Sequence, residues 1–476
     1  MHWSRLLELS ALAQARLVAR REVSSEELTR LYLARIEELN PLLQAFVRVW
    51  PAAALRSARR KDAQVRAGRT LPAFHGVPIG VKDMNLVRGR VTRFGSRAVA
   101  ILAFRDCRTT ASLRRAGFVL VGKTATSEFG AIPVTEPDLH PPTRNPWDPT
   151  RTAGGSSGGA ACAVAAGLLP IAHGSDGGGS IRIPSALVHV FGMKPSRGRV
   201  PNAYRQEDRH VLYTCGAISR SVEDAAAMLD VLAGLDVGRP HWLAPPDRPF
   251  AISCREAPGP LRVGLVLEPT AGVPAHPTIR EATLAVARLL ETLGHRVEER
   301  RPPPISVDDF LPLWRWQMAR VPVFRPGRLQ PVTRELRAAG RRIPTEVALA
   351  LQERMTRELD PLMHGVDLLL SPTVGVLTPA VGAWRGLPPA ETFAAAAALG
   401  VFTAPANVTG APAASVPAGL LDGRWPMGIQ LVGRPGDDAL VLSVSHVLEQ
   451  AMPWAHLWPT LAGREPTFPL ALQPGG

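Results

Sequence analysis

The chain has 476 residues, of which 46% are hydrophobic, so it can bury an extensive core in one large domain or a few ordinary ones. Its longest apolar run, residues 160–172, is too short to cross a membrane, and its N-terminus lacks the apolar stretch of a secretory signal, so we expect no membrane span and a cytoplasmic location. The net charge of +14 comes from arginines spread along the chain without a basic block, which argues against nucleic acid as a partner.

The N-terminal segment, residues 1–70, is predicted to be a helical arm. Ser24 and Glu27 have the spacing of a capping box, so a helix should start there and end near Asn40, before Pro41. From Gly76 the sequence changes to short apolar runs separated by glycines, which is typical of buried strands with loops at their ends.

The C-terminal half alternates apolar strands with helices. Strands are expected at 261–267, 366–373, 413–419 and 427–433, and helices at 278–293 and from about 437 to 450. Residues 301–345 are rich in proline and arginine, and we expect them to be the least regular part of the chain. Near-continuous apolar strands that alternate with helices indicate an α/β fold whose sheet is covered on both faces. We find no internal repeat and no linker that would split the chain.

The cysteines and histidines show no motif that would hold a metal. Cys107, Cys162, Cys215 and Cys254 lie far apart and form no CxxC, so we expect buried thiols. The twelve histidines include no HExxH, and no cofactor is predicted.

Lysine is scarce. Only four of the 55 basic residues are lysines, Lys61, Lys82, Lys123 and Lys194, and the other 51 are arginines. A buried lysine can lose its proton whereas an arginine does not, so a lysine retained in such a chain suggests a position where a guanidinium will not serve.

Two loops rich in glycine and serine are the main candidates for chemistry: GGSSGG at 154–159 and GSDGGGSIRIP at 174–184. Glycine has no Cβ and accepts unusual φ/ψ values, so the N–H groups of such loops can converge on a small oxyanion. Tight turns at strand ends would explain either loop taken alone. Neither loop ends in GK[ST], and no GxGxxG precedes a helix in the right frame, so no phosphate site is indicated.

The first loop also matches the nucleophile elbow GxSxG, centred on Ser156 or on Ser157. An elbow would make the protein an α/β-hydrolase-type esterase, and it requires an acidic residue and then a histidine downstream. His210, His364 and His446 are available, but none lies in a recognisable loop context. We therefore disfavour this alternative.

Three blocks resemble the signature of the amidase signature family: GVPIGVKDM at 76–84, GGSSGGAACAVAAG at 154–167 and GSDGGGSIRIPSALVHVFGMKPSRGRV at 174–200. Flanking segments at 122–130, 220–230 and 427–435 are similar to that family too, so the resemblance covers most of the chain except roughly 235–360. It implies a single large α/β/α domain over residues 1–476, built around a mixed central β-sheet. After the N-terminal arm, this domain would comprise a catalytic half at 71–235, a variable substrate-facing region at 236–400, and C-terminal strands and a helix at 401–476.

The resemblance also implies a Ser-cisSer-Lys triad. The family pattern puts the middle serine first in the SS pair and the nucleophile 24 residues later, so Ser156 matches the bridging serine and Ser180 the nucleophile. Lys82, inside GVKD, matches the general base. The backbone amides of the nucleophile loop, Gly177, Gly178, Gly179 and Ser180, would form an oxyanion hole.

This assignment is chemically consistent. A serine hydroxyl is a poor nucleophile until a base removes its proton, and lysine serves as a base only where burial lowers its pKa. Ser156 can pass the proton from Ser180 to Lys82, and the reverse transfer protonates the departing amine before water hydrolyses the acyl-enzyme.

Ser157, Asp176 and Arg182 are predicted to support the site rather than to react. Ser157 is interpreted as a hydrogen-bonding neighbour, and Asp176 with Arg182 as a brace of the loop. Ser175 stands where many relatives carry threonine, which keeps a hydroxyl. Ala125 replaces the asparagine usual in the GKTN block, which puts a local hydrogen bond in doubt.

Within this family we favour a free-standing amidase that converts a carboxylic amide to a carboxylate plus ammonia or an amine. The alternative is the glutaminase subunit of a tRNA-dependent amidotransferase, but the chain has only three tyrosines and lacks the Tyr-rich middle segment expected of such subunits. A catalytically inactive binding protein is disfavoured because all three triad positions are filled. Small-molecule amides are the expected partners, and a homodimer is the default oligomer.

Overall fold

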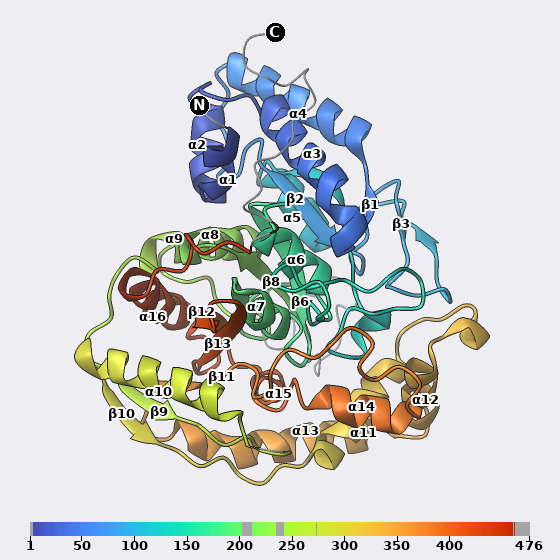
Figure 1. Ribbon diagram of the computed structural model, residues 1–476, viewed down its shortest axis with the longest axis vertical. Coiled ribbons are helices and arrows are strands. Elements are labelled where there is room, and N and C mark those ends of the chain that lie inside the picture. The colour runs from blue at the N-terminus through green and yellow to red at the C-terminus, as the bar shows by residue number, and fades with distance from the viewer. Residues whose placement is uncertain (1–2, 202–211, 235–241, 273, 460, 462–476) are drawn as a thin grey trace.

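An eleven-stranded sheet runs through the middle of the molecule, and helices cover both of its faces (Figure 1). The computed structural model describes residues 3–201, 212–234, 242–272, 274–459 and 461. The strands follow the order β1 (Phe46–Val49), β5 (Val119–Thr124), β2 (Pro78–Lys82), β6 (Ile171–Asp176), β8 (Thr214–Ser219), β7 (Phe191–Lys194), β12 (Ala413–Leu421), β13 (Trp425–Val432), β11 (Leu368–Pro372), β9 (Arg262–Leu265) and β10 (Arg296–Glu299).

The sheet is mixed, as the family resemblance implies. β5, β2 and β6 run parallel to one another, and so do β11, β9 and β10. The remaining neighbours are antiparallel. A separate hairpin-like pair, β3 (Val91–Thr92) and β4 (Ile101–Leu102), lies outside this sheet.

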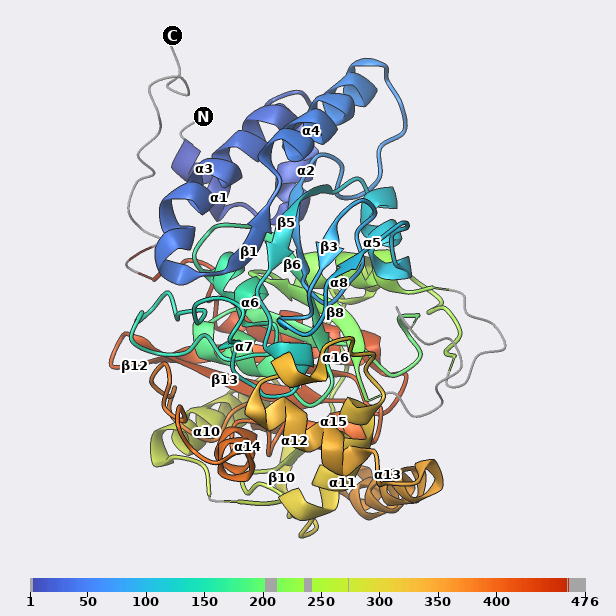
Figure 2. The ribbon, with the colours of Figure 1, turned by 90° about the vertical axis from the view of Figure 1, so that its right-hand side faces the viewer.

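Two helical layers bury the sheet. Five helices pack on one face: α5 (Arg108–Arg115), α8 (Val222–Leu232), α9 (Phe250–Ser253), α10 (Pro277–Thr292) and α16 (Asp438–Ala451). The other face carries α3 (Ser25–Leu43), α4 (Pro51–Arg66), α6 (Gly158–Ala165), α7 (Arg182–Val188), α11 (Val307–Ala319), α12 (Pro331–Gly340), α13 (Thr345–Leu359), α14 (Pro389–Ala397) and α15 (Ala404–Val408). The N-terminal α1 (Trp3–Glu8) and α2 (Ala11–Ala19) lie beside α3 and α4 at one end of the molecule (Figures 1 and 2).

The N-terminal prediction is correct in outline and wrong in two details. Ser24 and Glu27 form the expected capping box, but α3 continues through Pro41 to Leu43. Proline removes only one backbone hydrogen bond there, and the last turn still closes through the 2.8 Å bond from Gln44 N to Asn40 O. The arm is also not purely helical, because β1 pairs with β5 at the edge of the sheet.

The expectation that residues 301–345 are the least regular part is wrong, since they form α11 and α12. Ser306 and Asp309 make a capping box at the start of α11, and Pro331 occupies the first turn of α12, where a proline is tolerated. The strands and helices expected elsewhere in the C-terminal half are present: β9, β11, β12, β13, α10 and α16.

The four cysteines are buried and unpaired, as expected. Within the described ranges, no helix is both long and apolar enough to pass through a membrane.

Candidate active site

The site begins where two parallel strands end side by side. Lys82 is the last residue of β2, and Ser175 lies one residue before the end of β6. Gly80 pairs with Ala172 in a parallel ladder, so the carboxyl ends of the two strands meet at the same edge of the sheet. The side chain of Lys82 is completely buried there.

A serine pair reaches this edge from the N-terminus of α6. The helix packs very closely on the sheet, since a Cβ on Gly159 would lie 2.3 Å from the backbone nitrogen of Ala125. This approach brings Ser156 and Ser157 to Lys82, whose Nζ lies 2.8 Å from each of the two Oγ atoms. The Gly155–Ser156 peptide bond is cis, a feature that the sequence alone does not reveal.

The amine of Lys82 therefore lies among hydroxyl groups, and no carboxylate of the described residues pairs with it. Besides the serine pair, it donates to Ser175 Oγ at 3.0 Å. Burial lowers the pKa of Lys82 from 10.5 to about 7, and the negative charge of Asp176 offsets this only in part. A large fraction of Lys82 side chains is neutral near pH 7, so the amine can accept a proton.

Two of the other lysines are buried as well. Lys123 pairs with Asp83 at 3.6 Å, and Lys194 is 1% exposed. The carboxylate of Asp83 thus has a structural partner in Lys123. The scarcity of lysine in the sequence pointed to unusual sites, and three of the four lysines are buried.

Ser180 lies in the turn between β6 and α7. Ser157 N donates to Ser180 O at 3.1 Å, which ties this turn to the serine pair. The side chain of Ser180 lines the same cavity as Ser156. The Ser180 hydroxyl forms no hydrogen bond with any other residue that the structure describes. Catalytic hydrogen bonds in unliganded enzymes are often long and shorten only with substrate.

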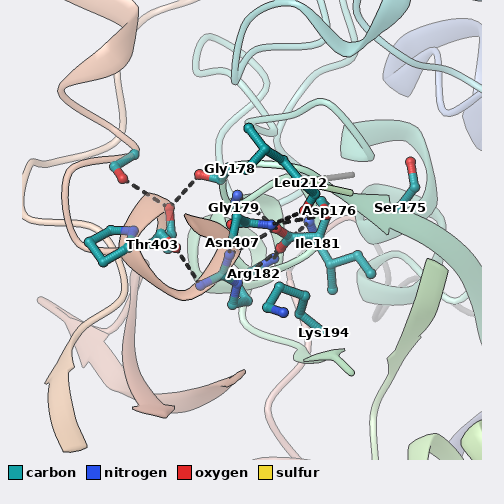
Figure 3. A network of polar contacts seen from close by, with 12 residues as sticks. Ser175, Asp176, Gly178, Gly179, Ile181, Arg182, Lys194, Leu212, Thr403 and Asn407 are labelled. Carbon is teal, nitrogen blue, oxygen red and sulfur yellow. Dashed lines mark hydrogen bonds and ion pairs between the residues drawn. The ribbon is translucent and has the colours of Figure 1, made fainter. Parts of the chain in front are cut away.

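A buried polar network, made by Asp176, Arg182, Thr403 and Asn407, holds the turn that carries Ser180 (Figure 3). Gln430 belongs to the same network, because its side-chain oxygen accepts a hydrogen bond from Arg182. The guanidinium binds the Asp176 carboxylate through two nitrogens, at 2.9 and 2.8 Å. Burial alone would raise the pKa of Asp176, but the charge and hydrogen bonds of Arg182 outweigh burial and hold this pKa below its usual range. The carboxylate also accepts from the amides of Gly179 and Ile181, so the turn is anchored at both of its ends.

The network also fixes one peptide of the glycine loop, residues 177–179, which directly precedes Ser180. Thr403 Oγ1 donates to Gly178 O at 2.7 Å, and Gly179 has a φ of +124° that favours glycine. Sequence reasoning missed Thr403, Asn407 and Gln430. Of these three residues, only Gln430 could have been noticed in the sequence. It is a polar residue within the apolar strand segment MGIQLVG, and a buried polar side chain needs a hydrogen-bond partner, which here is Arg182.

Two cavities open beside Ser180. The wide cavity, of about 290 Å³, is lined by Ser156, Ser180, Met84, Tyr213, Cys215 and Met318 among others. The narrow cavity, of about 100 Å³, is lined by Ser180, Ile183, Phe310, Phe393 and Val408 among others. The two share Gly130, Ser180 and Trp314.

The histidines needed for a nucleophile elbow do not support that alternative. His364 pairs with Asp360 on the surface, and His446 lies beside Glu449, so neither lines the cavity of Ser156. His210 lies outside the described residues. Over the described ranges we find no cluster of His, Cys, Asp or Glu suited to a metal ion.

The two departures from the family pattern have different consequences. Ser175 keeps the hydroxyl expected at its position, and this hydroxyl binds Lys82. Ala125 is buried and makes only backbone hydrogen bonds, to Ala45 and Gly159, so the side-chain bond of an asparagine is absent there.

Comparison with known proteins agrees with this geometry. The Amidase family model matches residues 27–320 and 327–442. The chain is 33% identical to a 6-aminohexanoate-cyclic-dimer hydrolase of Pseudomonas sp. (strain NK87), across 97% of this chain and 98% of the relative.

Solved structures show the same likeness. A 6-aminohexanoate cyclic dimer hydrolase complexed with substrate is 30% identical, with a TM-score of 0.88 over 96% of this chain and 99% of that one. A bacterial aryl acylamidase of the amidase signature family is 27% identical, with a TM-score of 0.85 over 98% of this chain and 99% of that one. The fold and the relatives together define an amide hydrolase. The chain belongs to the amidase signature family.

Proposed function

We propose that this chain hydrolyses carboxylic amides through a seryl acyl-enzyme, with Ser180 as nucleophile, Ser156 as proton relay and Lys82 as general base. The observation that carries the proposal is the buried amine of Lys82, which lies 2.8 Å from Ser156 Oγ and has no carboxylate partner in the part of the chain that the structure describes. An amine held neutral in this way is suited to accept a proton.

In the first step, Ser180 Oγ attacks the carbonyl carbon, its proton passes to Ser156 Oγ, and the Ser156 proton passes to Lys82 Nζ. The C–N bond then breaks, and the nitrogen leaves with a proton returned along the same path. Water attacks the ester carbon in the second half-reaction, which releases the carboxylate and restores Ser180.

The negative charge on the carbonyl oxygen would be stabilised by backbone amides of the glycine loop. Of the four predicted donors, Gly179 N already donates to Asp176 at 2.8 Å. We therefore assign the oxyanion to the amides of Gly177, Gly178 and Ser180. Gly179 contributes its backbone conformation, which Asp176 and Arg182 hold in place.

Ser157 fits a supporting role, because its hydroxyl binds Lys82 and its amide binds the backbone of Ser180. It would keep the amine oriented toward Ser156 while the proton moves.

The direct test is labelling with a serine-reactive fluorophosphonate. The adduct should lie on the peptide that contains Ser180, and Ser180→Ala should lose both labelling and amide hydrolysis with an unchanged circular dichroism spectrum. Ser185→Ala is a matched control, since Ser185 is also a buried serine, lies in α7, and its hydroxyl has no hydrogen-bond partner among the described residues. An adduct on Ser156 or Ser157 would overturn the proposal.

A glutaminase subunit remains the alternative within the family. Glutamine carries an α-amino group and an α-carboxylate, which both need charged or strongly polar partners. Among the described residues, Arg320 is the only charged side chain that lines either cavity at Ser180. This lining favours a neutral amide and a free-standing enzyme, for which a cytoplasmic location and a homodimer stay predictions.

A further inference from the structure

Ser180 is placed between two separate cavities rather than at the bottom of one. The wide and the narrow cavity share only Gly130, Ser180 and Trp314. Trp314 lines both cavities, and its Nε1 donates to Ala131 O at 3.0 Å. An amide bound at Ser180 can therefore extend in two directions.

The lining of the narrow cavity is apolar. It is built from aromatic and aliphatic side chains such as Ile183, Phe310, Phe393 and Val408, and no charged residue among those described lines it. Such a cavity favours a neutral hydrocarbon group, because a charge would lose its hydration without gaining a partner.

The serines differ in which cavity they line, and this sets the orientation of the amide. Ser156 and Ser175 line the wide cavity and are absent from the lining of the narrow one. Ser156 returns the proton to the departing nitrogen in the proposed mechanism, so this nitrogen has to face the wide cavity. The acyl group, on the other side of the same carbonyl, is then directed into the narrow cavity.

We infer that the substrate is a secondary amide, with a neutral apolar acyl group in the narrow cavity and the substituent of its nitrogen in the wide cavity. The inference rests on the proposed function, and it assigns the product as a carboxylate plus an amine rather than ammonia. When the C–N bond breaks, the nitrogen takes its proton from Ser156 and the amine leaves through the wide cavity. The acyl group stays bonded to Ser180 in the narrow cavity until water adds to the carbonyl carbon.

A matched set of anilides and primary amides tests whether secondary amides are the substrate class. The set comprises acetanilide, butyranilide and hexananilide, together with acetamide, butyramide and hexanamide; aniline release is followed by chromatography and ammonia release by a coupled assay. We expect kcat/KM to be at least tenfold higher for each anilide than for its primary amide. Each added acyl methylene should raise kcat/KM by roughly two- to fourfold until the narrow cavity is filled.

Two variants test which cavity holds the acyl group and which holds the substituent of the nitrogen. Ala397 lines the narrow cavity, and Ala397→Leu should lower kcat/KM for hexananilide relative to acetanilide by at least fivefold. Val321 lines the wide cavity, and Val321→Phe should lower the preference for anilides over primary amides while the dependence on acyl length stays as it is. If either variant fails to fold, the substrate series on the unaltered chain decides the class by itself.

Primary amides that match or exceed the corresponding anilides would overturn the inference. A dependence on acyl length that responds to Val321→Phe and not to Ala397→Leu would overturn the assignment of the two cavities. Failure of the proposed function is a different result: no amide of either kind is hydrolysed, and the fluorophosphonate does not label Ser180.

Discussion

Replacing Lys82 with arginine separates a proton acceptor from a structural cation. Arginine keeps the positive charge of a solvated lysine, but its guanidinium stays protonated and cannot act as a base. A structural cation would tolerate this change, particularly in a chain with 51 arginines and four lysines. We expect Lys82→Arg to be nearly as damaging as Lys82→Met, which removes the amine without adding a charge.

The expected magnitude follows from the burial of the amine. With a pKa of about 7, half of the Lys82 side chains are neutral at pH 7, against about one in 3,000 for a lysine with the ordinary pKa of 10.5. Loss of a general base typically costs between about 100-fold and 10,000-fold in rate. We expect kcat/KM to fall about 1,000-fold, which corresponds to about 4 kcal/mol of transition-state stabilisation.

The assay is the pH profile of kcat/KM for one anilide. The neutral amine is the active form, so kcat/KM of the unaltered enzyme should rise about tenfold per pH unit below about pH 7 and level off above it. Both variants should lose this ascending limb and keep a low residual activity from binding and the oxyanion hole. Near-normal kcat/KM in Lys82→Arg, with the fold confirmed by circular dichroism, would refute the role of Lys82 as the base.

Further predictions address the relay, the loop and the absence of a metal motif. Ser156→Ala should lower kcat/KM by about 100-fold or more while thermal unfolding changes little, and an unchanged rate would remove Ser156 from the proton path. Gly179→Ala should lower the free energy of unfolding by about 2 kcal/mol in urea titration, because the added Cβ would lie 2.1 Å from Thr403 Oγ1; an unchanged midpoint would contradict this packing. Arg182→Lys should cost about 3 kcal/mol of stability, since an ammonium cannot make the paired bonds to Asp176, and a stable, active variant would show that the network is dispensable. Dialysis against a strong chelator should leave activity unchanged, whereas a loss restored by zinc or manganese would show that the reaction needs a metal.

The sequence by itself pointed to candidate groups for the site because the blocks that resemble the family signature are local. Lys82 closes a short apolar run, the serine pair opens α6, and Ser180 follows β6, so each group sits in a segment whose pattern is readable alone. The family resemblance, with its spacing of 24 residues between the two serines, implied Ser156 and Ser180, and the scarcity of lysine drew attention to Lys82. Alternating apolar strands and helices also determined the class of the fold, since such runs need a sheet covered on both faces.

The tertiary structure decided what depends on contacts between distant parts of the chain. Asn407 lies 231 residues from Asp176, and Thr403 lies 225 residues from Gly178, so no local pattern predicts that they hold the loop that carries Ser180. The same holds for Trp314, which lines both cavities beside Ser180 although it comes from a segment that looked irregular. Periodicity and capping report the conformation of one segment, whereas the shape of a cavity depends on which segments pack together. The sequence therefore pointed to the proposed reactive groups, whereas the packing of α11, α14 and α15 shapes the narrow cavity beside Ser180.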